Sequence, residues 1–133
     1  MHKVSVIGAG NVGATAAYYL AAKNFAEVVM VDVVPGMPQG KALDYLHASP
    51  ARGYNIPIVG TNDYEAIAGS EVVVHTAGIA RKPGMDRMDL LRTNVGIAKT
   101  AAESIVKHAP DAVVIVVSNP LDVIAMAMAR ATG

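Results

Sequence analysis

The chain has 133 residues, 53% of them hydrophobic, which suffices for one compact domain that buries roughly two-thirds of its unfolded surface. Its 11 basic and 11 acidic residues cancel, so no partner among nucleic acids or anionic membranes is predicted, and no apolar run approaches the roughly 18 residues of a transmembrane helix. The absence of cysteine excludes disulfides, thiolate nucleophiles and cysteine-ligated metals, and it favours a reducing, cytoplasmic setting.

Short runs of β-branched residues alternate along the chain with longer stretches of helical period. Strands are predicted at residues 4–7, 28–32, 56–60, 72–75 and 113–117. Helices are predicted at residues 11–23 and 39–48, through residues 91–105, and from residue 119 to about residue 132. This alternation predicts an α/β fold, a doubly wound parallel sheet with helices on both faces.

A glycine motif follows the first predicted strand. Six residues form the pattern GxGxxG: Gly8, Ala9, Gly10, Asn11, Val12 and Gly13. In this context the first glycine permits a tight turn, the second lets the backbone approach a diphosphate, and the third allows close helix packing. The motif predicts a dinucleotide site at the helix N-terminus, and the alternative is a glycine-rich turn without a ligand.

Asp32 ends the second predicted strand, 19 residues after Gly13. A carboxylate near this spacing accepts hydrogen bonds from an adenosine ribose and repels a 2′-phosphate. The sequence therefore favours NAD over NADP, although a polar residue at the end of a strand is also an ordinary turn feature.

Basic residues gather between the fourth strand and the third helix. Arg81, Lys82, Arg87 and Arg92 outnumber the acids Asp86 and Asp89. The planar fork of arginine binds a carboxylate through two parallel hydrogen bonds, so two arginines six positions apart suit a substrate with carboxylates. Nearby glycine and proline residues would let the segment act as a lid. The alternative is a solvated loop without a ligand.

The third helix is the clearest of the four. An apolar stripe follows helical spacing through Leu91, Val95, Ala98, Ala102 and Ile105, and the opposite side carries Arg92, Lys99, Glu103 and Lys107. The last helix instead has a nearly continuous apolar run, residues 123–128, so we expect another part of the protein to cover it.

Asn119 and Pro120 precede the last helix, and two interpretations of Asn119 remain open. It could be the N-cap, with Pro120 in the first helical position, or its amide could orient a bound carbonyl or a nicotinamide ribose. The four histidines, His2, His47, His75 and His108, lack metal-site spacing, so no metal is predicted. For His75 at the end of a strand, a hydrogen-bonded, partly buried side chain is favoured over a proton carrier.

Five segments in this order resemble the N-terminal half of malate dehydrogenases of the lactate dehydrogenase-like group: GAGNVG, Asp32, TAGIARKPGMDR, Asn94 and VVSNPLD. The resemblance implies that Asn94, Val117, Ser118 and Asn119 also contact NAD. It further implies that Arg87 polarises the reacting carbonyl, that Asn119 contacts the substrate and that Arg81 selects it.

The implied reaction is reversible hydride transfer between malate and NAD, which gives oxaloacetate. A guanidinium at Arg81 would pair with the second carboxylate of oxaloacetate but stay unpaired against the methyl group of pyruvate. Malate is therefore expected rather than lactate.

The resemblance places no catalytic residue within this chain, because the catalytic His and Asp of the family would follow Gly133. We expect residues 1–133 to be an NAD-binding domain that lacks a sixth strand and the substrate domain and is inactive alone. A homo-oligomer, dimer or tetramer, is expected, with residues 39–48 as a contact helix. The alternatives are a stand-alone NAD-binding module, a lactate-specific relative, and a nucleotide-sugar or methyl-transferring enzyme.

Overall fold

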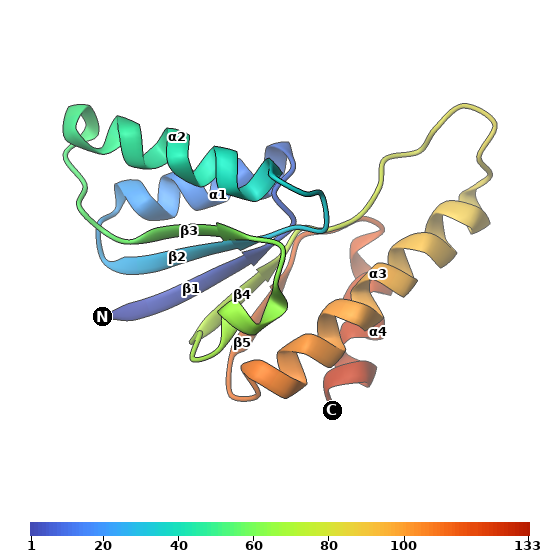
Figure 1. Ribbon diagram of the computed structural model, residues 1–133. Coiled ribbons are helices and arrows are strands. Elements are labelled where there is room, and N and C mark those ends of the chain that lie inside the picture. Colours follow the sequence, from blue (N-terminus) through green and yellow to red (C-terminus); the bar gives the residue numbers. More distant parts are fainter.

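The computed structural model describes all 133 residues and contains one parallel sheet of five strands in the order β3-β2-β1-β4-β5 (Figure 1). The strands are β1 (His2–Ile7), β2 (Ala26–Val31), β3 (Ile58–Thr61), β4 (Val72–His75) and β5 (Val113–Val116). The helices are α1 (Asn11–Ala22), α2 (Met37–Arg52), α3 (Arg87–His108) and α4 (Leu121–Thr132), with a 3-10 helix η1 (Tyr64–Ile67). The predicted doubly wound α/β fold is confirmed.

The sheet lies between two helical layers, with α1 and α2 on one face and α3 and α4 on the other (Figure 1). Two cores result, one of 11 buried residues beside α1 and α2 and one of 12 beside α3 and α4. Val6 belongs to the first core and Ile7 to the second, because successive side chains of a strand point to opposite faces. Val6 and Ile7 of β1 and residues 28–31 of β2 are therefore apolar on both faces of the sheet.

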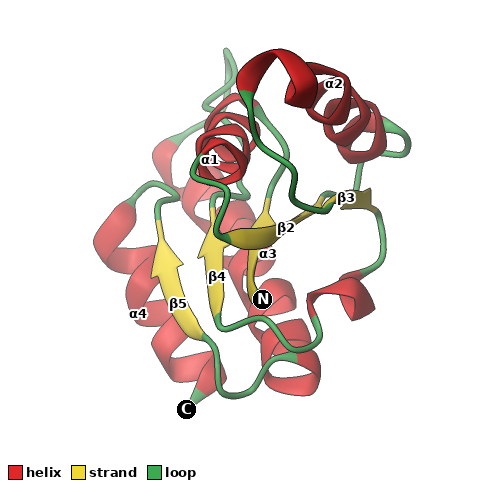
Figure 2. Ribbon diagram, turned by 90° about the vertical axis from the view of Figure 1, so that its left-hand side faces the viewer, coloured by secondary structure: helices red, strands yellow, loops and turns green.

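One face of β5 carries no helix (Figure 2). Val114 and Val116 pack against the core beneath α3 and α4, whereas Val113 and Ile115 on the other face are 64% and 48% exposed. The predicted helices on both faces are thus present for the sheet as a whole, and only the outer face of β5 is left open. Strand β5 is an edge strand with one open apolar face.

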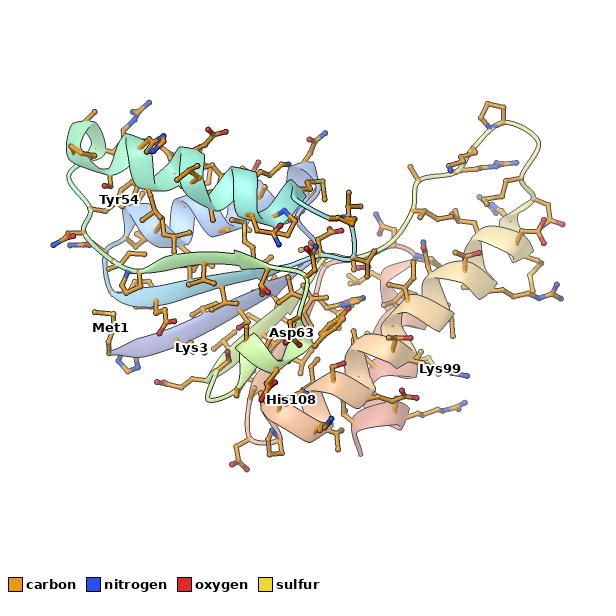
Figure 3. The ribbon with its side chains drawn as sticks, viewed as in Figure 1. Met1, Lys3, Tyr54, Asp63, Lys99 and His108 are labelled. Atoms are coloured by element: carbon orange, nitrogen blue, oxygen red, sulfur yellow. The ribbon has the colours of Figure 1, made fainter.

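The helix α3 has the predicted two sides. Ala98, Ala102 and Ile105 are buried, while Leu91 and Val95 are half-buried. The predicted polar side is exposed, and Lys99 projects away from the sheet (Figure 3). The sequence did not predict the burial of Ala101 and of the polar residue Asn94 on the same helix.

The helix α4 begins at Leu121 with Pro120 as its N-cap residue, and no side chain caps it. The interpretation of Asn119 as a capping residue is therefore wrong, and its side chain is left without that role. Ile124 and Met128 are buried against the core, whereas Met126 is 58% exposed. That another part of the protein covers this apolar side stays a prediction.

The start of α3 differs from the prediction, since the helix begins at Arg87 rather than near Leu91. Asp86 sets this start, because its Oδ1 accepts a hydrogen bond from the Asp89 N–H at 2.7 Å. None of the helices combines the length and hydropathy that crossing a membrane requires.

Candidate functional site

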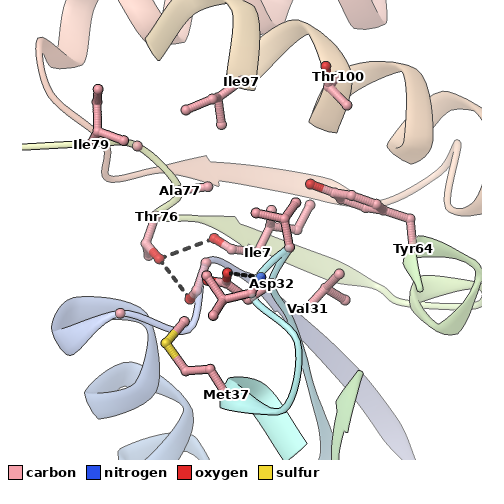
Figure 4. Close-up of a pocket in the computed structure, with 15 residues that line it drawn as sticks. Ile7, Val31, Asp32, Met37, Tyr64, Thr76, Ala77, Ile79, Ile97 and Thr100 are labelled. Carbon is pink, nitrogen blue, oxygen red and sulfur yellow. Dashed lines mark hydrogen bonds between the residues drawn. The ribbon is translucent and has the colours of Figure 1, made fainter. Parts of the chain in front are cut away.

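The segments that follow β1, β2, β4 and β5 meet at one edge because all five strands are parallel. A cavity of about 450 Å³, which we call the first cavity, lies at this edge (Figure 4). It is lined by residues that follow β1, β2 and β4, such as Gly8, Asp32 and Thr76. Between β1 and β4 the strand order reverses its direction, and doubly wound folds bind ligands at this position.

The three glycines of the motif differ in what the chain itself demands of them. Gly8 has φ of 101°, and a Cβ there would lie 2.7 Å from Ala77 N. A Cβ on Gly13 would lie 1.8 Å from the carbonyl oxygen of Gly8. A Cβ on Gly10, in contrast, would meet no atom within 4 Å. The first and third glycines are thus required by internal packing, whereas the space beside Gly10 is open to a ligand.

The N-terminus of α1 is open in the same place. Gly10 is the N-cap residue, no side chain caps the helix, and its first turn contains no acid. The first N–H groups of a helix lack partners within the helix, and their partial positive charge favours an anion. This turn therefore offers backbone donors to a phosphate or another anion.

Asp32 is held by the backbone of the glycine turn and of its own loop. Its Oδ2 accepts from the Ala9 N–H at 2.7 Å, and its Oδ1 accepts from the Val34 N–H at 3.0 Å. On the other side, the Thr76 hydroxyl donates to the carbonyl oxygens of Ile7 and Gly8 at 3.1 Å each (Figure 4). The turn is thus joined to β2 and β4 without any ligand, and the carboxylate still lines the first cavity.

The far wall of the first cavity was not predicted from the sequence. Tyr64 from η1 faces Ile97 and Thr100 of α3 across the cavity, and Met37 of α2 closes another side (Figure 4). Burial raises the pKa of the Tyr64 hydroxyl, and the nearby Asp32 carboxylate raises it further. These residues come from three different elements, so no local pattern could have identified them together.

A second cavity, of about 690 Å³, lies beside the basic segment. It brings together the three residues expected to bind the substrate, Arg81, Arg87 and Asn119. Ile79 lines both cavities and separates them. The Arg81 Nε donates to the carbonyl oxygen of Met85 at 3.2 Å, so this side chain also closes its own loop.

Two buried polar side chains connect the loops after β4 and β5. The Ser118 Oγ donates to the carbonyl oxygen of Ala77 at 2.7 Å. The Asn94 Oδ1 accepts from the Ile79 N–H at 2.9 Å, and its Nδ2 donates to the carbonyl oxygens of Ile79 and Asn119 at 3.3 and 3.1 Å. These two side chains therefore bond the loop after β4 to α3 and to the loop after β5.

His75 lies at the end of β4 and is fully buried, and neither ring nitrogen has a hydrogen-bond partner. The expectation of a hydrogen-bonded, partly buried side chain is wrong. Burial lowers the pKa of the imidazole to about 4, because the charged form loses its hydration there. A neutral ring at physiological pH follows.

The sequence profile of the lactate/malate dehydrogenase NAD-binding domain matches residues 2–133. The chain belongs to the lactate/malate dehydrogenase family. Malate dehydrogenases of Thermomicrobium roseum and Methanosarcina barkeri are 56% and 53% identical to it, over 98% and 100% of this chain and 42% and 43% of theirs. The chain thus spans less than half the length of these family members.

Solved structures of the family have the same fold. The malate dehydrogenase of Picrophilus torridus in its apo form superimposes with a TM-score of 0.95 at 46% identity, over 99% of this chain and 42% of that one. The lactate dehydrogenase of Cryptosporidium parvum in complex with lactic acid and NAD has a TM-score of 0.92 at 42% identity, with the same coverage. The five-stranded arrangement therefore matches both branches of the family.

The residues that the family resemblance assigned to NAD fall into three groups. Gly8, Gly10 and Asp32 line the first cavity, and Asn94 and Asn119 line the second. The others line neither cavity: Ala9, Asn11, Val12, Gly13, Val117 and Ser118. Of these, Ala9, Gly13 and Ser118 shape the site through the contacts described above. Contact between NAD and any of the eleven residues stays a prediction.

Proposed function

We propose that this chain is the cofactor-binding part of an NAD-dependent malate dehydrogenase. The observation that carries the proposal is the open space at Gly10, beside the uncapped N-terminus of α1 and close to the Asp32 carboxylate. Nothing in the chain requires a glycine at position 10, whereas a diphosphate that approaches the backbone does.

The first cavity fits the adenosine and diphosphate part of NAD. The N–H groups at the start of α1 bind the diphosphate, and Asp32 accepts hydrogen bonds from the ribose. Val31, Met37, Tyr64 and Ile97 provide an apolar surface for the adenine. Bound NAD supplies the acceptor for the hydride of malate, and its nicotinamide half extends past Ile79 toward the second cavity.

The second cavity fits a small dicarboxylate. Arg87 is the first residue of α3, where the helix dipole disfavours a cation and favours an anion. Local helix chemistry therefore does not explain this arginine, whereas pairing with a substrate carboxylate or carbonyl does. Arg81 and Asn119 line the same cavity, and the Asn119 side chain has no capping role that would compete.

Malate is favoured over lactate by Arg81, whose guanidinium would stay unpaired against a methyl group. The malate dehydrogenases of the preceding subsection, at 53% and 56% identity, support this choice. The likeness to the Cryptosporidium parvum lactate dehydrogenase keeps lactate as the second candidate.

The longer relatives suggest a division of labour. This chain binds NAD and presents the arginines, and the proton-transferring His and Asp come from the part of the relatives that the chain does not span. In the assembled enzyme, α2 is the proposed contact between subunits, since Leu43 and Leu46 on it are 52% and 39% exposed.

Titration calorimetry of the chain with NADH tests the cofactor site. Gly10→Ala should weaken binding about tenfold or more, because the new methyl group fills the space of the diphosphate. Gly40→Ala is the matched control, since its Cβ also meets open space and it lies on α2. Equal affinity for NADH in both variants would contradict the proposed site. Tight binding by a monodisperse oligomer would instead support a stand-alone NAD-binding module.

A chimera tests the enzymatic proposal. This chain is joined to the part of the Methanosarcina barkeri malate dehydrogenase that it does not span. The chimera should reduce oxaloacetate with NADH, and Arg81→Gln should shift its preference toward pyruvate about tenfold or more. The same substitution at Lys82 is the control. Selectivity that does not respond to Arg81→Gln would remove the proposed role of that residue.

A further inference from the structure

Asn94 is a polar residue within the helix α3, and only 3% of its surface is exposed. Asparagine is a poor helix former, and a buried amide costs free energy unless it is hydrogen-bonded. The side chain avoids this cost by bonding backbone groups of two other segments. A residue placed in this way calls for an explanation beyond helix stability.

The hydrogen bonds of Asn94 leave little capacity for a ligand. Its Oδ1 accepts from the Ile79 N–H, and its Nδ2 donates to the carbonyl oxygens of Ile79 and Asn119. Both amide hydrogens are thereby used, and one lone pair of Oδ1 remains. The side-chain amide thus bonds to both the N–H and the carbonyl oxygen of Ile79, as the backbone of a neighbouring strand does.

The two segments that Asn94 connects carry different parts of the site. Ile79 separates the first cavity from the second, and Asn119 lines the second cavity. The loop also passes very close to the amide, since a Cβ on Gly78 would lie 3.3 Å from the Asn94 Oδ1. Asn94 therefore bonds to backbone groups of two segments that line the second cavity.

We propose that Asn94 is a positioning residue: its amide fixes Ile79 and the Asn119 carbonyl relative to each other, so that the wall between the cofactor and substrate cavities keeps its place. This inference rests on the proposed function only for what the two cavities bind. It assigns to Asn94 an action through these two loops, which is separate from the predicted contact of Asn94 with NAD.

The first test uses the ligand-free chain. Backbone amide NMR compares Asn94→Ala and Asn94→Asp with the control Asn24→Asp, whose Oδ1 accepts from the Asn55 N–H away from the site. Signals of residues 117–122, except Pro120, which has no amide hydrogen, should shift in both Asn94 variants and not in the control. Exchange of the Ile79 amide hydrogen should be about tenfold faster in Asn94→Ala, relative to that of Gly8, because its acceptor is lost.

The Asp variant sharpens the result. An aspartate keeps an acceptor for the Ile79 N–H but loses both donors, so the Ile79 amide should stay protected while residues 117–122 still shift. Shifts confined to α3 in both variants would overturn the proposal, since they would show that Asn94 does not link the loops.

The second test compares nucleotides of two lengths by titration calorimetry. Affinity for ADP, which ends before Ile79, should change less than about twofold in Asn94→Ala, whereas affinity for NADH should fall about tenfold. An equal loss for both would indicate general loosening and overturn the proposal. If the unsubstituted chain binds neither nucleotide, the proposed function fails, whereas the ligand-free spectra still decide the role of Asn94.

Discussion

The glycine turn, residues 8–13, and the basic loop, residues 80–86, are held in different ways. The turn bonds to β2 through Gly8 N and Val31 O and to Asp32 through Ala9 N, and Thr76 bonds it from β4. The hydrogen bonds of the basic loop stay within it or connect it to the start of α3. A site that binds through backbone N–H groups needs a preformed geometry, whereas one that binds through long charged side chains can adjust on binding.

Among the substitutions that test this difference, Gly13→Ala should have the largest effect on the free energy of unfolding. The new Cβ would lie 1.8 Å from the Gly8 carbonyl oxygen, so either the turn or the helix must shift, at a cost of about 3 kcal/mol in the free energy of unfolding. Urea denaturation measures it, with Gly10→Ala as the control that should cost less than about 1 kcal/mol. A loss below about 1 kcal/mol for Gly13→Ala would show that the turn rearranges around the new side chain as easily as a flexible loop does.

His75 tests whether the end of β4, which precedes the basic loop, is as firmly held as the glycine turn. The pKa of its ring is about 4 in the folded chain and 6.5 when exposed, so the unfolded chain binds the extra proton first as pH falls. Stability contributed by the neutral ring is complete above pH 6.5 and falls by about 1.4 kcal/mol per pH unit between 6.5 and 4.

The measurement is urea denaturation across this pH range for the chain and for His75→Leu. The variant should lose this part of the pH dependence, and it should be more stable at pH 5 because no unpartnered ring remains buried. The exposed His47 provides the control His47→Gln, which should keep the slope. Titration of His75 near pH 6.5 in the folded chain, followed by NMR, would contradict this prediction, because it would show that the ring is open to solvent.

Arg87→Gln should have the smallest effect on the free energy of unfolding. The effect should be stabilising, because the arginine is proposed to serve binding and not the fold. Removal of a cation from the first turn of α3 should raise the free energy of unfolding by about 0.3–1 kcal/mol at low salt, and less at high salt. Lys107→Gln in the last turn is the matched control and should lower it by a similar amount. A loss of stability on Arg87→Gln would indicate that the arginine supports the fold.

Much of the site was predictable because its signals are local. The glycine spacing, the position of Asp32 after β2 and the apolar stripe of α3 each depend on residues close in sequence, and Val72–His75 was predicted with its exact bounds. The residues that were missed depend on other elements. Tyr64 and Thr100 line one cavity only because η1 and α3 lie on the same side of the sheet. For Asn119 the sequence left two interpretations open, and only the start of α4 at Leu121 ruled out the capping one.

The sequence by itself determined the alternation of strands and helices, the dinucleotide motif and the basic segment, since backbone preferences and short spacings set all three. Only the tertiary structure decided that Gly10 faces open space, that Asn94 joins two loops and that His75 is buried without a partner. These properties depend on how segments up to 69 residues apart pack together, as in the Thr76–Ile7 hydrogen bond, and no local pattern encodes such contacts.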